Sequence, residues 1–268
     1  MPASDPSPTP IALIRERMRE CRAPLLDTEV LLDNYSPQPF SLGAFRELVR
    51  DRDAPVLCGF IDVPIQAVVA LGRADKLLGN RDTWRTVVNK GVHGHGWTHG
   101  VFDYFDGDIL DEPFPAEGAT GILELSCVGG AVTCANGNHR LAGALAWIAS
   151  TRPHDPVMRK VWIKATPVRR NLVASILELR SRGAKFACAM GLVEGRPEAV
   201  LRVTQWGIAR TYCVHGGALE RRYTLWRRPL DHEGSWHWWA IPDAVLNAWS
   251  NSGWLDRQAG SLRMREFA

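Results

Sequence analysis

Residues 135–147 have the sequence ANGNHRLAGALAW. Two small turn residues, Gly137 and Asn138, stand in front of a His-Arg pair and an alanine-rich segment. Gly137 permits a left-handed backbone turn, and Asn138 is a favourable helix cap. The pattern predicts that a helix begins here, with its unpaired N–H groups and the positive end of its dipole open to an anion.

The residues that follow this turn favour phosphate as the anion. His139 and Arg140 add side-chain donors at the same place, and the forked guanidinium of arginine matches the geometry of phosphate. Ala142, Gly143 and Ala144 keep the helix slim enough to pack closely on a sheet. We interpret the stretch as a phosphate-binding turn, and the alternative interpretation is a capped helix with a surface His and Arg.

Short elements surround the turn in a definite order. The elements predicted by apolar patterning and turn residues are a strand region at 56–71, a short helix at 83–90, a strand hairpin at 122–134, the helix at 139–148 and a strand at 158–168. The strand region is broken near Gly59 and Pro64, the short helix ends at Gly91, and Gly129-Gly130 forms the hairpin turn.

This order of elements, with its Gly-Asn-His-Arg box, resembles the ParB/sulfiredoxin-like superfamily over about residues 60–168. Members of that superfamily include ParB CTPases, sulfiredoxin, free-serine kinases and ParB-like nucleases. The resemblance implies an α+β fold with a mixed sheet and helices, in which the box binds nucleotide phosphates. It therefore implies ATP or CTP as a cofactor, together with Mg²⁺.

The resemblance carries over to particular residues. It implies that Gly137, Asn138, His139 and Arg140 hold the phosphates, and it matches Asn80-Arg81 to an earlier Asn-Pro-Arg-like box that here lacks its proline. Sulfiredoxin has its catalytic cysteine where this chain has Asn138, so reduction of a sulfinic acid is not expected. The box is often preceded by Asp, where this chain has Asn136.

A long polar segment at residues 91–120 supplies the candidate metal ligands. Asp106 and Asp108 are candidates to hold Mg²⁺ beside a triphosphate, or to deprotonate a substrate hydroxyl. His139 of the turn is also a catalytic candidate, and so is Glu124, in the following strand, if it faces the same cleft. We expect the segment to be a loop that forms a lid or wall over the phosphate turn, too polar to belong to the core, although a plain solvated acidic loop fits the same residues.

Three histidines in the same segment offer a different metal site. The run HGHGWTH places His93, His95 and His99 at a spacing that can bind Zn²⁺ or another transition ion. Glycine-rich spacing of this kind also occurs in loops without a metal.

Composition bounds the remaining possibilities. The chain has 268 residues, 46% hydrophobic and 23% charged, which is typical of a globular protein with a sizeable core. We expect no membrane contact, no secretory signal in the Pro/Ser-rich start, and a cytoplasmic protein. The six cysteines form no CxxC pair, which favours buried free thiols over disulfides.

The last third of the chain differs from the rest. Residues 169–268 carry 15 Lys and Arg against 9 Asp and Glu, and seven of the eleven Trp lie after residue 200. The residues that would make a stacking and charged surface for nucleic acid are Arg221, Arg222, Trp226, Arg227 and Arg228. The alternative is that these tryptophans fill a core face.

Together these observations predict four segments and one leading function. We expect a disordered tail at 1–10, N-terminal helices at 11–54, the ParB/sulfiredoxin-like domain at 55–168 and a basic α/β extension at 169–268. The leading hypothesis is a nucleotide-dependent enzyme that transfers phosphoryl or nucleotidyl groups to an unknown acceptor or hydrolyses the nucleotide. The alternative is a ParB-like DNA-binding protein or nuclease.

Overall fold

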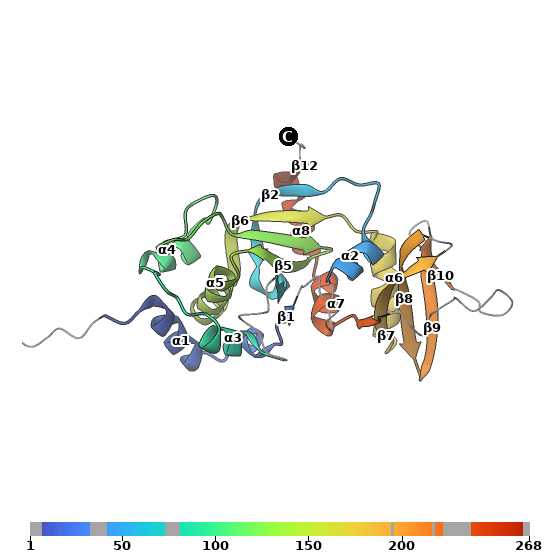
Figure 1. Cartoon of the computed structure of the whole chain (residues 1–268), viewed down its shortest axis with the longest axis horizontal. Coiled ribbons are helices and arrows are strands. Elements are labelled where there is room, and N and C mark those ends of the chain that lie inside the picture. The colour runs from blue at the N-terminus through green and yellow to red at the C-terminus, as the bar shows by residue number, and fades with distance from the viewer. Residues whose placement is uncertain are drawn as a thin grey trace, which may run out of the picture.

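The computed structural model describes residues 7–32, 42–72, 81–193, 196–215, 218–221 and 237–264. These residues form an α+β fold with two sheets, one mixed and one antiparallel, and this confirms the predicted class. The first sheet and its helices make up one end of the molecule and the second sheet the other (Figure 1). Within the described residues, no helix is long and apolar enough to cross a membrane.

The first sheet contains seven strands in the order β1-β3-β5-β4-β6-β2-β12. Their bounds are Leu31–Leu32 for β1, Leu57–Pro64 for β2, Val68–Leu71 for β3, Glu124–Val128 for β4, Ala131–Asn136 for β5, Val157–Thr166 for β6 and Arg263–Met264 for β12. The pairs β1–β3, β3–β5 and β4–β6 are parallel, and the other neighbours are antiparallel. The carboxyl ends of β3 and β5 therefore lie at the edge of the sheet where β4 begins.

Local signals in the sequence place most of these strands. The break predicted at Pro64 separates β2 from β3 through the short 3-10 helix η2 (Ile65–Ala67), whereas Gly59 lies inside β2. Gly129 and Gly130 have φ of 60° and 99° and close the β4–β5 hairpin as predicted. Glycine adopts such angles at little cost, which suits it to a two-residue hairpin turn.

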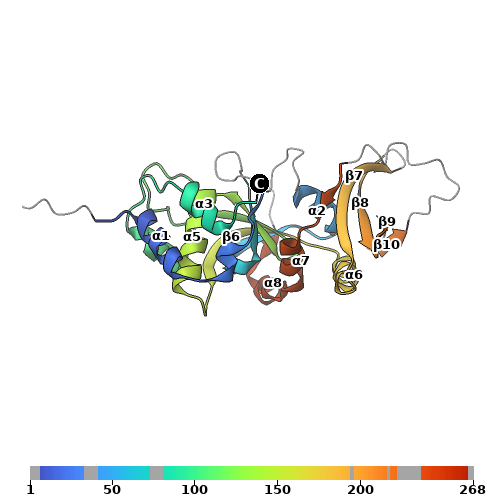
Figure 2. The same cartoon turned by 90° about the horizontal axis from the view of Figure 1, so that it is seen from below.

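Helices cover one face of this sheet (Figures 1 and 2). Their bounds are Pro10–Glu20 for α1, Pro24–Asp27 for the 3-10 helix η1, Trp84–Lys90 for α3, Gly100–Asp106 for α4 and Asn138–Thr151 for α5. The helix α5 is buried along most of its length and packs against α1, α3 and α4. The predicted end of α3 at Gly91 is confirmed. Thr83, the first residue of the predicted helix, is its cap, because its Oγ1 accepts a hydrogen bond from Thr86 N.

The segment 91–120 is not the polar loop that its composition predicts. It contains α4, and its side chains Val101, Phe105 and Phe114 are buried in the core of the first sheet. Trp97 also packs there, and its indole takes the space that a side chain at Gly143 would fill. The expectation that this segment stays out of the core is therefore wrong, because its apolar residues are widely spaced among polar ones and show no periodicity.

The second sheet contains five antiparallel strands in the order β10-β9-β8-β7-β11. Their bounds are Lys185–Val193 for β7, Arg196–Gln205 for β8, Ile208–His215 for β9, Ala218–Arg221 for β10 and Trp239–Ala240 for β11. From its pattern alone, the run at residues 198–214 is compatible with two strands or with a helix and a strand, and the structure has two strands there.

A second hydrophobic core joins the two sheets. It gathers residues from the second sheet, from β3, β4 and β5 of the first, and from three helices. These helices are α2 (Leu42–Val49), α6 (Arg170–Ser181) and α7 (Asp243–Ser250). On α2, Phe45, Leu48 and Val49 lie at helical spacing and form its buried stripe.

The segments of the chain do not follow the sheets in simple order. The helix α2 belongs to the N-terminal part of the chain but packs against β7 and β8 of the second sheet. After the second sheet, α8 (Gly253–Gln258), the 3-10 helix η4 (Ala259–Ser261) and β12 return to the first sheet beside β2. Each core thus contains parts of at least three of the four segments expected from the sequence.

The cysteines agree with the sequence-based expectation. All six are free, and five of them are buried, while Cys21 is half-buried. Burial raises the pKa of the Cys127 thiol to about 12 and raises that of Cys134 and Cys188 well above the usual range. These three thiols therefore stay protonated at neutral pH and act as small apolar side chains.

Candidate functional site

The predicted phosphate turn has an open helix start. Gly137 adopts the left-handed conformation, with φ 93° and ψ 37°, and α5 begins at Asn138. The first intrahelical hydrogen bond runs from Leu141 N to the Gly137 carbonyl. Among the described residues, no acceptor is found for the N–H groups of Asn138, His139 and Arg140, and no side chain caps the helix. Within the described part of the chain, these three backbone donors are free at the positive end of the 14-residue helix.

Asn138 does not cap the helix as expected but ties it to the neighbouring strand. Its Oδ1 accepts a hydrogen bond of 3.0 Å from the N–H of Gly72, which directly follows β3. A Cβ atom at Gly72 would lie 2.3 Å from the Cys134 carbonyl oxygen, so only glycine fits at this position. The carboxyl ends of the parallel strands β3 and β5 are thereby held together beside the start of α5.

The structure assigns Arg140 a supporting place beneath the turn. Its side chain is buried, with 7% exposed. Its guanidinium donates hydrogen bonds to the carbonyls of Gly121 at 3.0 Å and Thr120 at 3.4 Å, and it lies 4.9 Å from the centre of the Phe114 ring. This geometry favours Arg140 as the residue that fixes the turn, rather than the direct phosphate ligand that the sequence predicts.

His139 is the side chain of the turn with an unused polar atom. It is half-buried, and its Nδ1 atom is buried without a hydrogen-bond partner among the described residues. Its ring lies 4.6 Å, centre to centre, from the ring of the exposed His93. Burial, and second the neighbouring His93, lower the pKa of His139 below its usual value. His139 is therefore neutral at pH 7 and able to accept or donate one hydrogen bond at this atom.

The segment 91–121 reaches the turn at both ends. His93, near its start, contacts His139, and Thr120 and Gly121, at its end, accept from Arg140. The expectation that this segment forms a wall beside the turn is therefore supported by its two ends, while its middle packs into the core.

Glu124 is the carboxylate that the structure brings next to the turn. It begins β4 and lies opposite Asn136, the last residue of β5, in the strand ladder. The Glu124 side chain is exposed, and the Asn136 side chain donates to the carbonyl of Ile122 at 2.9 Å. Glu124 therefore lies at the same sheet edge as the free N–H groups of α5.

Asp106 and Asp108 lie elsewhere. Asp106 accepts a hydrogen bond from Trp147 Nε1 at 3.1 Å and is 3.6 Å from Arg152 Nε, which places it against the last turns of α5. Eight residues of helix separate Trp147 from His139, or roughly 12 Å along the axis. Asp108 forms an isolated bridge with Arg159 in β6. The structure does not bring these carboxylates to the start of α5, because α4 packs along the other end of the helix.

The three histidines of the HGHGWTH run do not converge either. His93 contacts His139 and accepts from the N–H of His95, while His99 precedes α4 and contacts Phe102. In the described part of the chain, no group of three or more His, Cys, Asp or Glu side chains is placed to hold a metal ion.

Other predicted residues fall partly outside the described structure. Arg81 is exposed and has φ 61°, whereas its partner Asn80 lies outside the described residues. Of the predicted nucleic-acid surface, Arg221 ends β10, and Arg222, Trp226, Arg227 and Arg228 lie outside the described residues.

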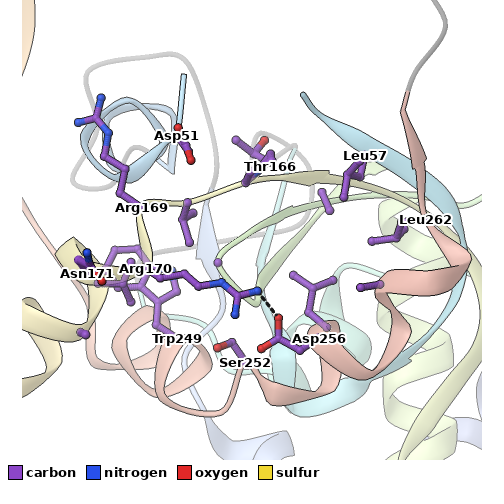
Figure 3. A pocket seen from close by; sticks show the side chains of 18 of the residues that line it. Asp51, Leu57, Thr166, Arg169, Arg170, Asn171, Trp249, Ser252, Asp256 and Leu262 are labelled. Carbon is purple, nitrogen blue, oxygen red and sulfur yellow. Dashed lines mark hydrogen bonds and ion pairs between the residues drawn. The ribbon is translucent and has the colours of Figure 1, made fainter. Parts of the chain in front are cut away.

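A groove that the sequence does not predict lies at the opposite edge of the first sheet (Figure 3). It has a volume of about 850 Å³ and runs past the ends of β4 and β6, between α6 and α8. Arg170 and Asp256 face each other across it, with Arg170 Nη2 donating to Asp256 Oδ1 at 2.6 Å (Figure 3). Its lining mixes aspartates and arginines with apolar residues, so its charge favours no single class of ligand.

Comparisons with protein-family models, with curated proteins and with solved structures gave no match to this chain.

Proposed function

We propose that the start of α5 binds the phosphates of a nucleotide, ATP or CTP, and that the chain is a nucleotide-dependent phosphotransferase or hydrolase. The observation that carries this proposal is the uncapped helix start after Gly137, where the backbone N–H groups of residues 138–140 have no acceptor among the described residues. An oxyanion with several acceptor oxygens satisfies such donors and gains from the helix dipole.

The histidine pair supports the same site. A neutral His139 with an unpartnered Nδ1 atom beside three free N–H groups is suited to donate to a phosphate oxygen. The exposed His93 adjoins it and provides a second imidazole at the mouth of the site. In this proposal Arg140 positions the turn through Thr120 and Gly121, and its contribution to phosphate binding is indirect.

We propose that Glu124 binds Mg²⁺ and takes up the proton of the acceptor hydroxyl. Mg²⁺ in nucleotide sites is usually held by one or two carboxylates, with phosphate oxygens and water as its other ligands. A single exposed carboxylate at the edge of the turn fits that need, and bound Mg²⁺ would neutralise charge on the phosphates. If the acceptor hydroxyl binds beside it, Glu124 is also placed to take up the proton.

The arrangement of elements agrees with the proposed ParB/sulfiredoxin-like ancestry. The β4–β5 hairpin is followed by the left-handed Gly137 and then by α5, and β3, which is parallel to β5, ends beside the same turn. The proposed membership of this superfamily rests on this order and on the Gly-Asn-His-Arg box. We accordingly place the phosphate site at residues 137–139 and propose that Arg81, with Asn80, belongs to its neighbourhood.

The sharpest test places a negative charge among the free N–H groups. Asn138→Asp keeps the acceptor for Gly72 N–H but adds a carboxylate where the phosphates would bind. We expect calorimetric titration with ATP, CTP, GTP and UTP in Mg²⁺ to show binding of one nucleotide. We expect Asn138→Asp to weaken that binding at least about tenfold, because the added carboxylate repels the phosphates and competes with them for the positive end of the helix dipole.

Control variants distinguish a loss of nucleotide binding at the site from a general effect of the substitution. Asn247→Asp makes the same chemical change on α7, where Asn247 accepts from Arg180, and should leave nucleotide affinity unchanged. Glu124→Gln should reduce the effect of Mg²⁺ on binding, whereas Asp108→Asn should not. A wild-type chain that binds none of the four nucleotides would refute the proposal, as would equal affinity in Asn138→Asp.

A further inference from the structure

The hairpin that joins β8 to β9 carries an exposed tryptophan at its tip. Trp206 and Gly207 form a two-residue turn between the paired residues Gln205 and Ile208. The Trp206 side chain is 85% exposed and that of Ile208 is 55% exposed. The larger apolar side chains of the second sheet are otherwise buried or half-buried where the structure describes them. The tip therefore exposes an aromatic ring and a neighbouring apolar side chain to water, and such an exposed apolar surface is a candidate contact site for a ligand.

The backbone at this tip is strained by the tryptophan. Trp206 has φ 51° and Gly207 has φ 77°, so both residues are left-handed, as a type I′ turn requires. Gly, Asn and Asp adopt this conformation readily, while a bulky aromatic residue does so at a cost. Folding therefore does not explain the presence of tryptophan at this position, whereas a contact made by its ring does.

Two exposed cations lie close to the tip. Lys185 and Arg210 are exposed and have no ion pair among the described residues. Arg180 and Arg182, at the end of α6, are instead paired with Asp243 and Glu178. Lys185 lies opposite Thr204 and Arg210 opposite Val203 in the ladder, so the two cations flank the tip from different faces of the sheet.

A cation and an aromatic ring continue this surface away from the tip. Arg202 lies on the same face as Thr204 and Lys185, because strand side chains alternate and cross-strand partners share a face. Its guanidinium stacks at 3.7 Å from the centre of the Trp238 ring. This face of the sheet thus presents, in order, Trp238, Arg202, Lys185 and the tip with Trp206.

We propose that the β8–β9 hairpin binds single-stranded nucleic acid, with the Trp206 ring stacked on a base and Lys185, Arg202 and Arg210 contacting phosphates. Alternating rings and cations are the features that bind a single strand without reading its sequence. The charge favours a polyanion, and the apolar tip, of only Trp206 and Ile208, is small for insertion into a membrane. This surface lies on the second sheet and does not depend on the proposed nucleotide site on α5.

The test uses a variant that suits the turn better than the native residue. Asn is favoured at the left-handed first position of an Asn-Gly turn, so Trp206→Asn removes the ring without disturbing the fold. We expect the full chain to bind a labelled dT20 oligonucleotide or its U20 RNA counterpart in fluorescence anisotropy at low salt. Trp206→Asn should weaken this binding about tenfold, as expected for loss of one stacked base, and Trp206→Phe should largely retain it.

The cations are tested through salt dependence. A double variant Lys185→Ala/Arg210→Ala should lower the slope of log affinity against log salt by roughly 1.4, since each single-strand phosphate contact contributes about 0.7. Lys90→Ala, which removes an exposed cation at the end of α3, is the control and should leave the slope unchanged.

Three results would overturn the proposal. One is the absence of oligonucleotide binding by the wild type at low salt, and another is equal affinity in Trp206→Asn. The third is binding to vesicles with 30% phosphatidylserine that Trp206→Asn abolishes while oligonucleotide binding is unaffected, which would assign the tip to a membrane surface.

Discussion

At the scale of single residues, the place of Arg140 in a helix could be predicted from the sequence, but the groups that its side chain contacts could not. The sequence places it correctly in the first turn of a helix, because Gly137 and Asn138 are local signals. Its guanidinium nevertheless bonds to carbonyls about twenty residues earlier in the chain, in a segment that folds back along α5. No local pattern contains that information, since it depends on how the buried side chains of residues 97–114 pack.

Arg140 is expected to matter more for stability than for ligand contact. Arg140→Ala leaves two backbone carbonyls without their charged donor and removes the contact with Phe114, so we expect a loss of about 2–3 kcal/mol in unfolding free energy. Urea unfolding followed by circular dichroism measures this change. Arg140→Lys keeps the charge but not the fork and should lose less, and a change below about 0.5 kcal/mol in Arg140→Ala would contradict the assignment.

His139 gives the stability of the protein a dependence on pH. Burial lowers its pKa in the folded state below the ordinary value of 6.5, so the unfolded chain takes up the proton first as the pH falls. The contribution of neutral His139 to the unfolding free energy is therefore fully present above about pH 6.5 and is lost as the pH falls below that value. We expect the difference in unfolding free energy between pH 7.5 and pH 5.5 to be smaller in His139→Gln than in the wild type.

That comparison isolates one histidine among eight. His95→Gln is the matched control, because His95 is exposed and lies in the same segment. If His95→Gln flattens the pH dependence as much as His139→Gln does, the effect does not come from the buried imidazole of His139.

At the scale of elements, local signals were sufficient to predict where some elements begin and end. The helix α3 begins after Thr83 and ends at Gly91, and Gly129-Gly130 closes the β4–β5 hairpin, because caps and tight turns are determined by neighbouring residues. The helix α4 was not predicted, since its buried residues Val101, Tyr104 and Phe105 are too few to establish a helical period. Its docking also removes Asp106 from the predicted metal site, and that displacement is a tertiary effect.

The same docking explains the glycine within α5. The predicted reason for Gly143 was close packing on the sheet, but the neighbour that occupies its space is the Trp97 indole, whose Cη2 atom would lie 2.6 Å from an added Cβ. Trp97 is itself held against Phe105 and Phe114. A side chain at position 143 would therefore push a packed aromatic cluster away from the helix.

We expect Gly143→Ala to destabilise the protein by about 1–2 kcal/mol. Alanine gains up to about 1 kcal/mol over glycine in a helix, but overpacking a well-filled core costs about 1–3 kcal/mol. Chemical denaturation measures the balance. Gly260→Ala is the control, because nothing lies within 4 Å of its added Cβ, and it should change stability by less than about 0.5 kcal/mol.

At the scale of the whole molecule, the two sheets share the second hydrophobic core. It contains residues of β3, β4 and β5 from the first sheet and of β7 and β8 from the second, with α2, α6 and α7 between them. From the sequence we predicted strands and helices on both sides of residue 168, although not α4, and we expected the two parts to be successive domains. Hydrophobic patterning shows which residues are buried, and it does not show which distant segments they are buried against.

Trp249 on α7 lies where the parts of this core meet. Its side chain is 2% exposed, and its Nε1 donates a buried hydrogen bond of 2.9 Å to the carbonyl of Val128 at the end of β4. The ring also contacts the hairpin turn, since an added Cβ on Gly129 would lie 3.2 Å from it. One side chain therefore joins α7, which packs against β3, β5 and α6, to the hairpin that leads into the α5 turn.

We expect this shared core to make the described fold unfold as one unit. Calorimetry should show a single transition for the wild type, because separating the sheets would expose Trp249 and the apolar faces of α2 and α6. Trp249→Phe removes the donor to Val128 and should lower stability by about 1–3 kcal/mol, which shifts the midpoint down by several degrees without splitting the transition. Two resolved transitions in the wild type, or a shift in only one of two transitions in the variant, would show instead that the sheets fold independently.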